Sequence, residues 1–158
     1  MAKSSSLAPQ TITPHVGSTY PAQFAASTAS RQKRVLGDAL GLSAFGVNLT
    51  TLPPGCESAL RHYHMREDEF IYIVSGELDL VTDDGTQTLS AGMVAGFPGG
   101  EKNGHHLINR SAGDAVYLEV GNRDPDCQTF YPGLDLMIGP KDADGKRHFK
   151  NLAGDRYA

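Results

Sequence analysis

The hydrophobic residues of this chain alternate with polar ones in short runs, and glycine or proline ends most of the runs. In the segment 69–82, "EFIYIVSGELDLVT", two such runs flank Gly76. Similar runs cover about 43–52, 86–92, 93–98, 105–109 and 115–121, and a last hairpin is expected around Asp144 and Gly145. A period of two is the pattern of a β-strand with one buried face. The segment 83–85, "DDG", predicts a tight hairpin between two of these strands.

Many short strands separated by turn residues predict an all-β fold, a single antiparallel β-sandwich or jelly-roll barrel. A parallel sheet would need crossover helices, and no stretch with a helical period is long enough to provide them. We expect residues 31–125 to form the barrel. Residues 1–30, rich in Ser, Thr, Ala and Pro, are expected to form an extended or partly disordered N-terminal arm. Residues 126–158 are expected to form a C-terminal hairpin and tail packed on the barrel.

Composition narrows the classes of partner. The 158 residues are 39% hydrophobic and 20% charged, which is typical of one globular domain. The net charge of -4, with no basic run longer than "RQKR" at 31–34, argues against a nucleic-acid partner. No apolar run reaches the length of a membrane span or a signal peptide, so we expect no membrane partner and a cytoplasmic protein. Cys56 and Cys127 form no Cys-x-x-Cys pair, which argues against a cysteine zinc site and favours two free thiols.

Histidines and a glutamate gather where two of the strands meet. His62 and His64 are two residues apart, so in a strand both imidazoles point to the same side. Glu69 opens the next run on its expected inward face, and a tight corner would bring it beside this pair. Downstream, alternation places His105 and His106 on opposite faces. Three imidazoles and one carboxylate suit a divalent transition metal, and an octahedral ion would keep two positions open for water, substrate or dioxygen.

The spacing of these residues resembles the two motifs of the cupin superfamily. The first motif, His-x-His-x4-Glu-x6-Gly, is matched at 62–76, and its leading glycine, Gly55, stands one residue further upstream than usual. The second motif is matched by Gly-x5-Pro-x-Gly at 92–100 and His-x3-Asn at 105–109, with four residues between these parts where two are usual. The resemblance covers about residues 36–121, most of the chain outside the expected arm and tail.

The resemblance implies a metal centre and an assembly. By analogy with the family, one divalent transition metal per chain (Fe, Mn, Ni or Zn) would be held inside the barrel. Its ligands would be His62, His64, Glu69 and His105. Small single-domain cupins of this kind are commonly homodimers, so we also expect a homodimer.

The implied function is a metal-dependent enzyme acting on a small oxygenated metabolite, with sugar-phosphate isomerase as the first expectation. A metal-dependent dioxygenase, decarboxylase or lyase is an alternative, and a non-catalytic cupin that binds a small ligand is another. The sequence identifies no catalytic acid or base. An isomerase needs a cationic site for the phosphate, and Lys102 and Arg110 are the cations near the second motif, although each is more typical of a solvated surface charge.

Some assignments within the motifs have alternatives. Family spacing also tolerates Asp68 as the carboxylate ligand, but alternation favours Glu69 and makes Asp68 a solvated turn residue. His106 is either a partly buried strand histidine or an acid–base group. Asn109 is expected to fix a turn through side-chain hydrogen bonds to the backbone. Three turn glycines are expected at positive φ: Gly76, Gly92 and Gly100. Four strand residues remain open between core packing and pocket lining: Tyr72, Phe97, Tyr117 and Glu119.

Overall fold

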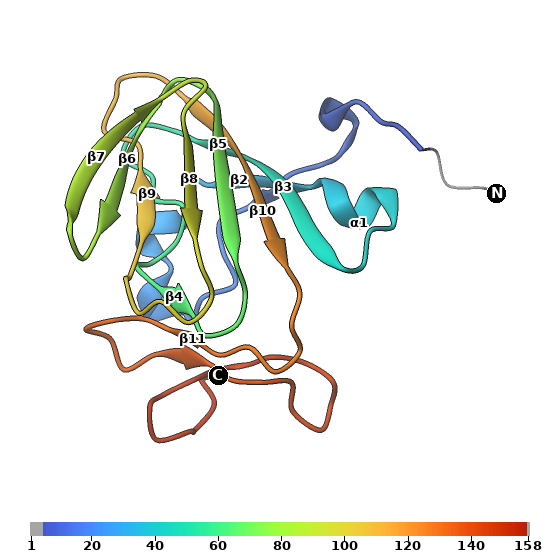
Figure 1. Cartoon of the computed structure of the whole chain (residues 1–158), viewed down its shortest axis with the longest axis vertical. Coiled ribbons are helices and arrows are strands. Elements are labelled where there is room, and N and C mark those ends of the chain that lie inside the picture. The colour runs from blue at the N-terminus through green and yellow to red at the C-terminus, as the bar shows by residue number, and fades with distance from the viewer. Residues whose placement is uncertain (1–4, 158) are drawn as a thin grey trace.

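A computed structural model describes residues 5–157 and confirms the expected antiparallel β-sandwich. Every strand pair among these residues is antiparallel. The strands form a six-stranded sheet, a three-stranded sheet and a smaller four-stranded sheet, which lies toward one end of the molecule (Figure 1). No helix in the described range has the length and apolar character needed to span a membrane.

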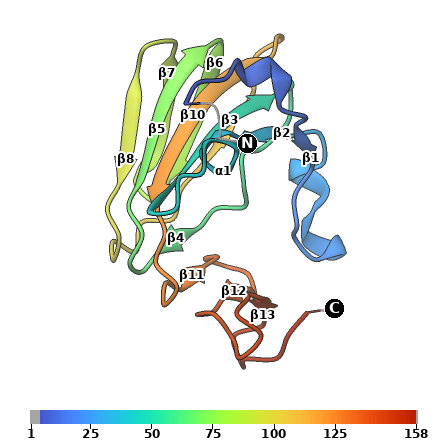
Figure 2. The same cartoon turned by 90° about the vertical axis from the view of Figure 1, so that its right-hand side faces the viewer.

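The six-stranded sheet forms one wall and the three-stranded sheet the other. In spatial order the first contains β1 (His15–Val16), β2 (Gln32–Val35), β3 (Phe45–Leu52), β10 (Ala115–Asn122), β5 (Glu69–Ser75) and β8 (Val94–Phe97). The second contains β7 (Gly85–Ser90), β6 (Glu77–Thr82) and β9 (His106–Ile108). The third contains β13 (Phe149–Lys150), β12 (Met137–Ile138), β11 (Thr129–Phe130) and β4 (Tyr63–His64). Figure 2 shows the strands of the large sheet spread across the view from β8 to β1, with the C-terminal strands β11, β12 and β13 below β4.

The hydrophobic core lies between the six-stranded sheet and the three-stranded sheet. The alternation in β5 is that of a strand with one face in the core, because Ile71 and Ile73 are buried whereas Phe70, Tyr72 and Val74 are exposed. Leucines of β6, β7 and β9 meet these isoleucines from the opposite wall. Burial of this apolar surface is the main favourable contribution to folding.

The N-terminal arm and the C-terminal segment contact each other near one end of the cavity. The arm contains three 3-10 turns, η1 (Pro9–Thr11), η2 (Ala22–Phe24) and η3 (Ala26–Thr28), besides β1. Tyr20 of the arm packs its ring on Tyr131 and Phe149 of the C-terminal segment, which joins both termini near one end of the cavity. Residues 1–4 of the expected arm and residue 158 of the expected tail lie outside the described residues. A short helix that the sequence pattern did not indicate, α1 (Leu36–Leu40), follows β2.

Turn chemistry follows the sequence expectation. Asn109 is fully buried, and its side-chain nitrogen donates to the carbonyls of Leu52 and Gly113. Its side-chain oxygen accepts from the backbone and the hydroxyl of Ser111, so one amide closes the turn between β9 and β10. The three motif glycines have φ of 75° (Gly76), 89° (Gly92) and 91° (Gly100).

Candidate metal centre

Two opposed backbone segments and one strand end bring the four expected ligands together. His62 and His105 form an isolated β-bridge, with N–O distances of 3.1 and 2.9 Å between their backbones. Directly opposed residues project to the same side of a sheet, and the two imidazole centroids are 4.8 Å apart. His64 ends β4 and Glu69 begins β5, so the loop 65–68 is the corner expected from the sequence.

The imidazoles converge on one carboxylate oxygen. The Nε2 atoms of His62, His64 and His105 lie 3.7, 3.5 and 3.3 Å from Oε2 of Glu69. All four side chains line a cavity of about 360 Å³. Three imidazoles and one carboxylate therefore present their donor atoms to one small volume.

Hydrogen bonds to backbone carbonyls determine which ring nitrogen of His62 and His105 carries the proton. Nδ1 of His62 lies 2.7 Å from the carbonyl of Leu60, and Nδ1 of His105 lies 3.3 Å from that of Asn103. A carbonyl only accepts, so Nδ1 carries the proton and Nε2 turns a lone pair toward Glu69. The lone pair of Nε2 and those of the Glu69 oxygen repel each other unless a cation or a proton lies between them.

The donor set fits a divalent transition metal. Nitrogen and oxygen ligands lie about 2.0–2.2 Å from such an ion, so neighbouring ligands around it are about 3.0–3.5 Å apart. The separations from Glu69 given above are close to this range. Imidazole and carboxylate are also the ligand types that these metals share. The residues thus fit the metal that the sequence pattern implied.

The surroundings of these side chains shift their pKa values. Burial opposes the charge of Glu69, but its contacts with His105, His62 and His64 outweigh burial and hold the pKa of the carboxyl well below the usual range. Burial lowers the pKa of His62, which keeps that imidazole neutral. His64 differs: burial lowers its pKa, yet contacts with Cys127, Glu69 and Glu67 raise the pKa to about 9. A metal must displace the proton of His64 in order to bind there.

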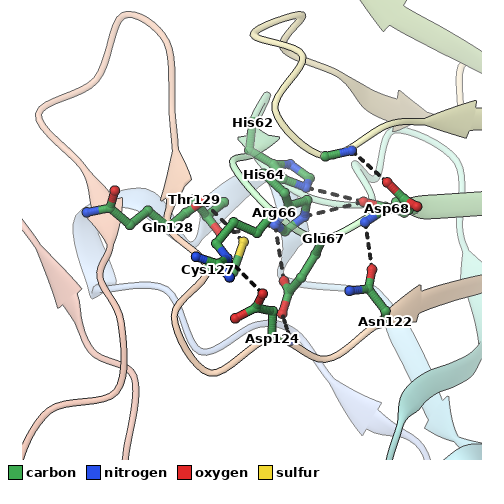
Figure 3. Close-up of polar contacts among 12 residues, drawn as sticks. His62, His64, Arg66, Glu67, Asp68, Asn122, Asp124, Cys127, Gln128 and Thr129 are labelled. Atoms are coloured by element: carbon green, nitrogen blue, oxygen red, sulfur yellow. Dashed lines mark hydrogen bonds and ion pairs between the residues drawn. The ribbon is translucent and has the colours of Figure 1, made fainter.

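His64 and His105 are held from outside the centre. The ring of His105 stacks on Phe97 with centroids 3.6 Å apart and planes 2° apart. Nδ1 of His64 is 3.1 Å from the hydroxyl of Thr129 on β11 and 3.5 Å from Oε2 of Glu67. Such outer contacts orient metal-binding imidazoles. Figure 3 shows this side of the site, where Thr129 and Cys127 approach His64 from the C-terminal segment.

Glu67 and Cys127 form a second group of potential ligands with His64. Both cysteines are buried free thiols, in agreement with the expectation from their spacing. The other group contains His62, Glu69 and His105, without His64. His64 lies between the two, because its Nε2 is 3.5 Å from Glu69 and its Nδ1 is 3.5 Å from Glu67. An imidazole that binds a metal through Nε2 keeps Nδ1 for such outer partners.

Asp68, the alternative carboxylate ligand, and His106, the candidate acid–base group, lie outside the convergence, although both line the cavity. Asp68 accepts a hydrogen bond from the backbone of Gly99, and its own backbone N–H donates to the side chain of Asn122, so it joins the loop at Gly99 to the end of β10 (Figure 3). Nε2 of His106 lies 3.9 Å from Glu57, in the three-stranded wall. Neither residue belongs to a group of potential metal ligands among the described residues.

The cavity contains charges that the sequence did not place there. Arg110 pairs with Asp79, and neither Arg110 nor Lys102 is among the described residues that line the cavity. Four other basic side chains line it: Arg31, Lys33, Arg123 and Arg147. Four carboxylates also line it: Glu67, Asp68, Glu69 and Glu119.

Of the four strand residues left open above, three line the cavity. Phe97, Tyr117 and Glu119 do so, whereas Tyr72 is exposed on the outer face of the large sheet. The sequence contains one signal for Glu119, because this charged residue interrupts the apolar run of β10. It lies two residues after the buried Tyr117 and therefore on the same face of the strand. No comparable signal marked Thr129 or Cys127, which lie in or beside a strand of two residues.

Comparisons with known proteins agree with this geometry. A family model described as the cupin domain matches residues 48–121. A sugar phosphate isomerase of the cupin superfamily from Silicibacter pomeroyi is 41% identical, with a TM-score of 0.89 over 97% of this chain and 96% of that one. A candidate sugar phosphate isomerase from Acidithiobacillus ferrooxidans is 28% identical, with a TM-score of 0.71 over 82% of this chain and 81% of that one.

A more distant structure shares the fold alone. A polyketide cyclase from Streptomyces resistomycificus is 17% identical, with a TM-score of 0.62 over 93% of this chain and 84% of that one. No curated protein matches the sequence. One fold therefore accompanies different activities, and the site itself must carry the argument about function.

Proposed function

Because the chain belongs to the cupin superfamily, we propose that it is a metal-dependent enzyme that isomerises a phosphorylated sugar. The ligands would be His62, His64, Glu69 and His105, which hold one divalent transition metal per chain (Fe, Mn, Ni or Zn). The observation that carries the proposal is the convergence of three imidazole Nε2 atoms on one oxygen of Glu69 within a cavity. When bound, such a metal acts as a Lewis acid that polarises a carbonyl group.

The charge balance of the cavity favours an anionic substrate. The four basic side chains and the four carboxylates that line it cancel formally. A bound divalent cation would therefore leave the cavity with net positive charge, which attracts a phosphate-bearing molecule. A volume of about 360 Å³ suits a small metabolite. The names of the two relatives at 41% and 28% identity support a sugar phosphate in particular.

Aromatic side chains in the cavity wall pack against the imidazoles. Phe97 covers one face of His105, and Tyr131 lies with its ring centroid 5.9 Å from that of His62. These rings shield the imidazoles from water, and exclusion of water strengthens the electrostatic interactions within a site. The open end of the cavity would admit the substrate.

The experiment that tests the proposal is an isomerase assay with sugar phosphates. Ribose 5-phosphate, glucose 6-phosphate and mannose 6-phosphate are incubated with the metal-loaded protein, and ketose formation is followed by NMR. We expect conversion of at least one of them, its loss after chelation, and no conversion of unphosphorylated glucose. Failure with all three would contradict the proposal, and dioxygen uptake or decarboxylation would then identify one of the other reactions.

We also propose that the chain forms a homodimer through the outer face of the large sheet. Phe70, Tyr72 and Val74 on β5 are 40–46% exposed, and Val94 on the edge strand β8 is 54% exposed. Tyr72 and Val94 are cross-strand partners, so these side chains form one continuous apolar patch. A second copy suits it because an apolar patch complements itself across a two-fold axis.

Light scattering tests the dimer. The wild-type protein is expected to have the mass of two chains, and Val94→Asp that of one, because two carboxylates would meet near the axis. Glu77→Gln, an exposed change on β6 of the other sheet, is the matched control and should remain dimeric. A monomeric wild-type protein at micromolar concentration would exclude the dimer.

A further inference from the structure

A polar cluster lies on the inner face of the large sheet, apart from the metal ligands. Nζ of Lys33 on β2 lies 2.5 Å from Oε1 of Glu119 on β10. Nδ2 of Asn48, on the intervening strand β3, donates to the same oxygen at 2.8 Å. All three residues line the cavity. One carboxylate is thus held by a cation and an amide on the wall of the candidate site.

The strand register places this cluster close to the metal ligands. Glu119 is the cross-strand partner of Ile71, and Gly121 is the partner of Glu69. Glu119 and Glu69 are therefore diagonal neighbours on one face of the sheet, with Cβ atoms roughly 7 Å apart. Gly121 and its partner on β3, Gly46, line the cavity in the row beside Glu69, where the carbonyl of Asp68 and the side chain of Arg123 approach them. A small molecule in this space would touch the metal centre and Glu119 together.

A buried hydroxyl independently indicates that this wall receives a polar ligand. Tyr117, two residues before Glu119 on the same face, is 1% exposed and lines the cavity. Its hydroxyl makes no hydrogen bond of standard geometry with the described residues, and its contact with the hydroxyl of Thr50, its cross-strand partner, offsets only part of the effect of burial. Burial raises the pKa of this phenol well above its usual range, so it remains a neutral donor. Buried polar groups nearly always have a partner, and a substrate hydroxyl would supply one here.

A purely structural role accounts less well for the cluster. An ion pair removed from bulk water pays a desolvation cost that apolar packing avoids, and the neighbouring inner-face position on β5 is the apolar Ile71. Lys33 and Asn48 both bind Oε1 of Glu119, which orients the carboxylate and leaves its other oxygen to accept a proton from a ligand in the cavity. Its two partners keep it oriented without covering it.

We propose that Glu119 is the base of the isomerisation and that Lys33 and Asn48 are its positioning residues. This inference rests on the proposed function. The carboxylate of Glu119 takes the proton from C2 of an open-chain aldose phosphate. The electron pair of that C–H bond forms the C1=C2 double bond, while the carbonyl π pair moves to O1. The O2 hydroxyl gives its proton to O1, Glu119 returns its proton to C1, and the C2=O bond of the ketose forms.

Deuterium transfer tests the step directly. The assay uses D₂O and the aldose phosphate that the wild type converts fastest, and NMR follows deuterium at C1 of the product. We expect wild-type product to contain solvent deuterium, because the proton held by Glu119 exchanges with solvent. Glu119→Gln is expected to lower kcat by at least about 100-fold, the range of general-base catalysis. Its metal content and its affinity for ribose 5-phosphate should stay within about 3-fold of wild type, since Gln cannot accept the proton but keeps the size of Glu.

Matched variants separate a base from a structural residue. Glu119→Ala should regain part of its rate when formate is added, because a free carboxylate can replace the missing base. Lys33→Met should lower kcat with little change in KM, and Lys33→Arg should restore much of the rate. Glu77→Gln, which lies outside the cavity, should behave as wild type.

The outcomes distinguish the two proposals. Isomerisation without solvent deuterium, or an active Glu119→Gln variant, would overturn the role of Glu119 and leave the isomerase intact. Loss of metal or of ribose 5-phosphate binding in Glu119→Gln, without rescue of Glu119→Ala by formate, would also overturn it. A wild-type protein that converts none of the sugar phosphates would overturn both proposals.

Discussion

His64→Ala is expected to lose most of its bound metal. The substitution removes one of three imidazoles that converge on Glu69 and breaks the link to Thr129. Loss of an outer contact alone typically weakens metal binding about 10–100-fold, so loss of a ligand should weaken it by at least about 100-fold. Elemental analysis of the purified variant measures the metal directly.

The barrel of His64→Ala should remain folded, because the core is built from leucines and isoleucines of other strands. Circular dichroism checks this, and His106→Ala is the matched control. Its imidazole contacts Glu57 rather than Glu69, so that variant should keep its metal. Full metal occupancy in His64→Ala would mean that the ligand set is wrong, and loss of metal in His106→Ala would mean that the wrong histidine of the pair at 105–106 is assigned.

Gly76→Ala is expected to destabilise the protein strongly. Gly76 turns the chain between β5 and β6 with φ of 75°, a region that costs an L-residue about 1–2 kcal/mol. An added Cβ would also lie 2.8 Å from backbone atoms of Asp114 and Ala115. Relief of such a clash typically costs about 1–3 kcal/mol. Together we expect a loss of about 2–5 kcal/mol in the free energy of unfolding, measured by urea denaturation of the chelated protein.

Gly55→Ala separates the two causes. Gly55 has a nearly equal φ of 81°, but an added Cβ would meet no atom within 4 Å. This variant should therefore lose only the conformational part, about 1–2 kcal/mol. Equal losses in the two variants would show that the contact with the 114–115 backbone contributes nothing.

Sequence patterns predicted the features that depend on local order. Alternation from Phe70 to Val74 assigns the buried and exposed faces of β5, as observed. The hairpin at 83–85 and the turn held by Asn109 follow from local side-chain chemistry. Motif spacing selected the four side chains that converge in the cavity, because spacing along paired strands determines which side chains meet.

Other features depend on contacts between distant segments. Glu119 meets Lys33 across 86 residues of sequence, and only the register of β2, β3 and β10 brings them together. The link from Thr129 to His64 rests on a pairing of two-residue strands, which are too short to show a period. Arg110, although next to the second motif, pairs with Asp79. Proximity in sequence was thus a poor guide to the cations of the cavity.

The central claim is that these four side chains hold a metal, and the most direct test combines elemental analysis with thermal unfolding before and after chelation. The account predicts about one iron, manganese, nickel or zinc per chain in untagged protein. Removal of the metal should lower Tm, because a ligand present at about 1,000 times its Kd stabilises the folded state by roughly 4 kcal/mol. Protein that contains no metal, and whose Tm does not change when each of these ions is added, would contradict the account.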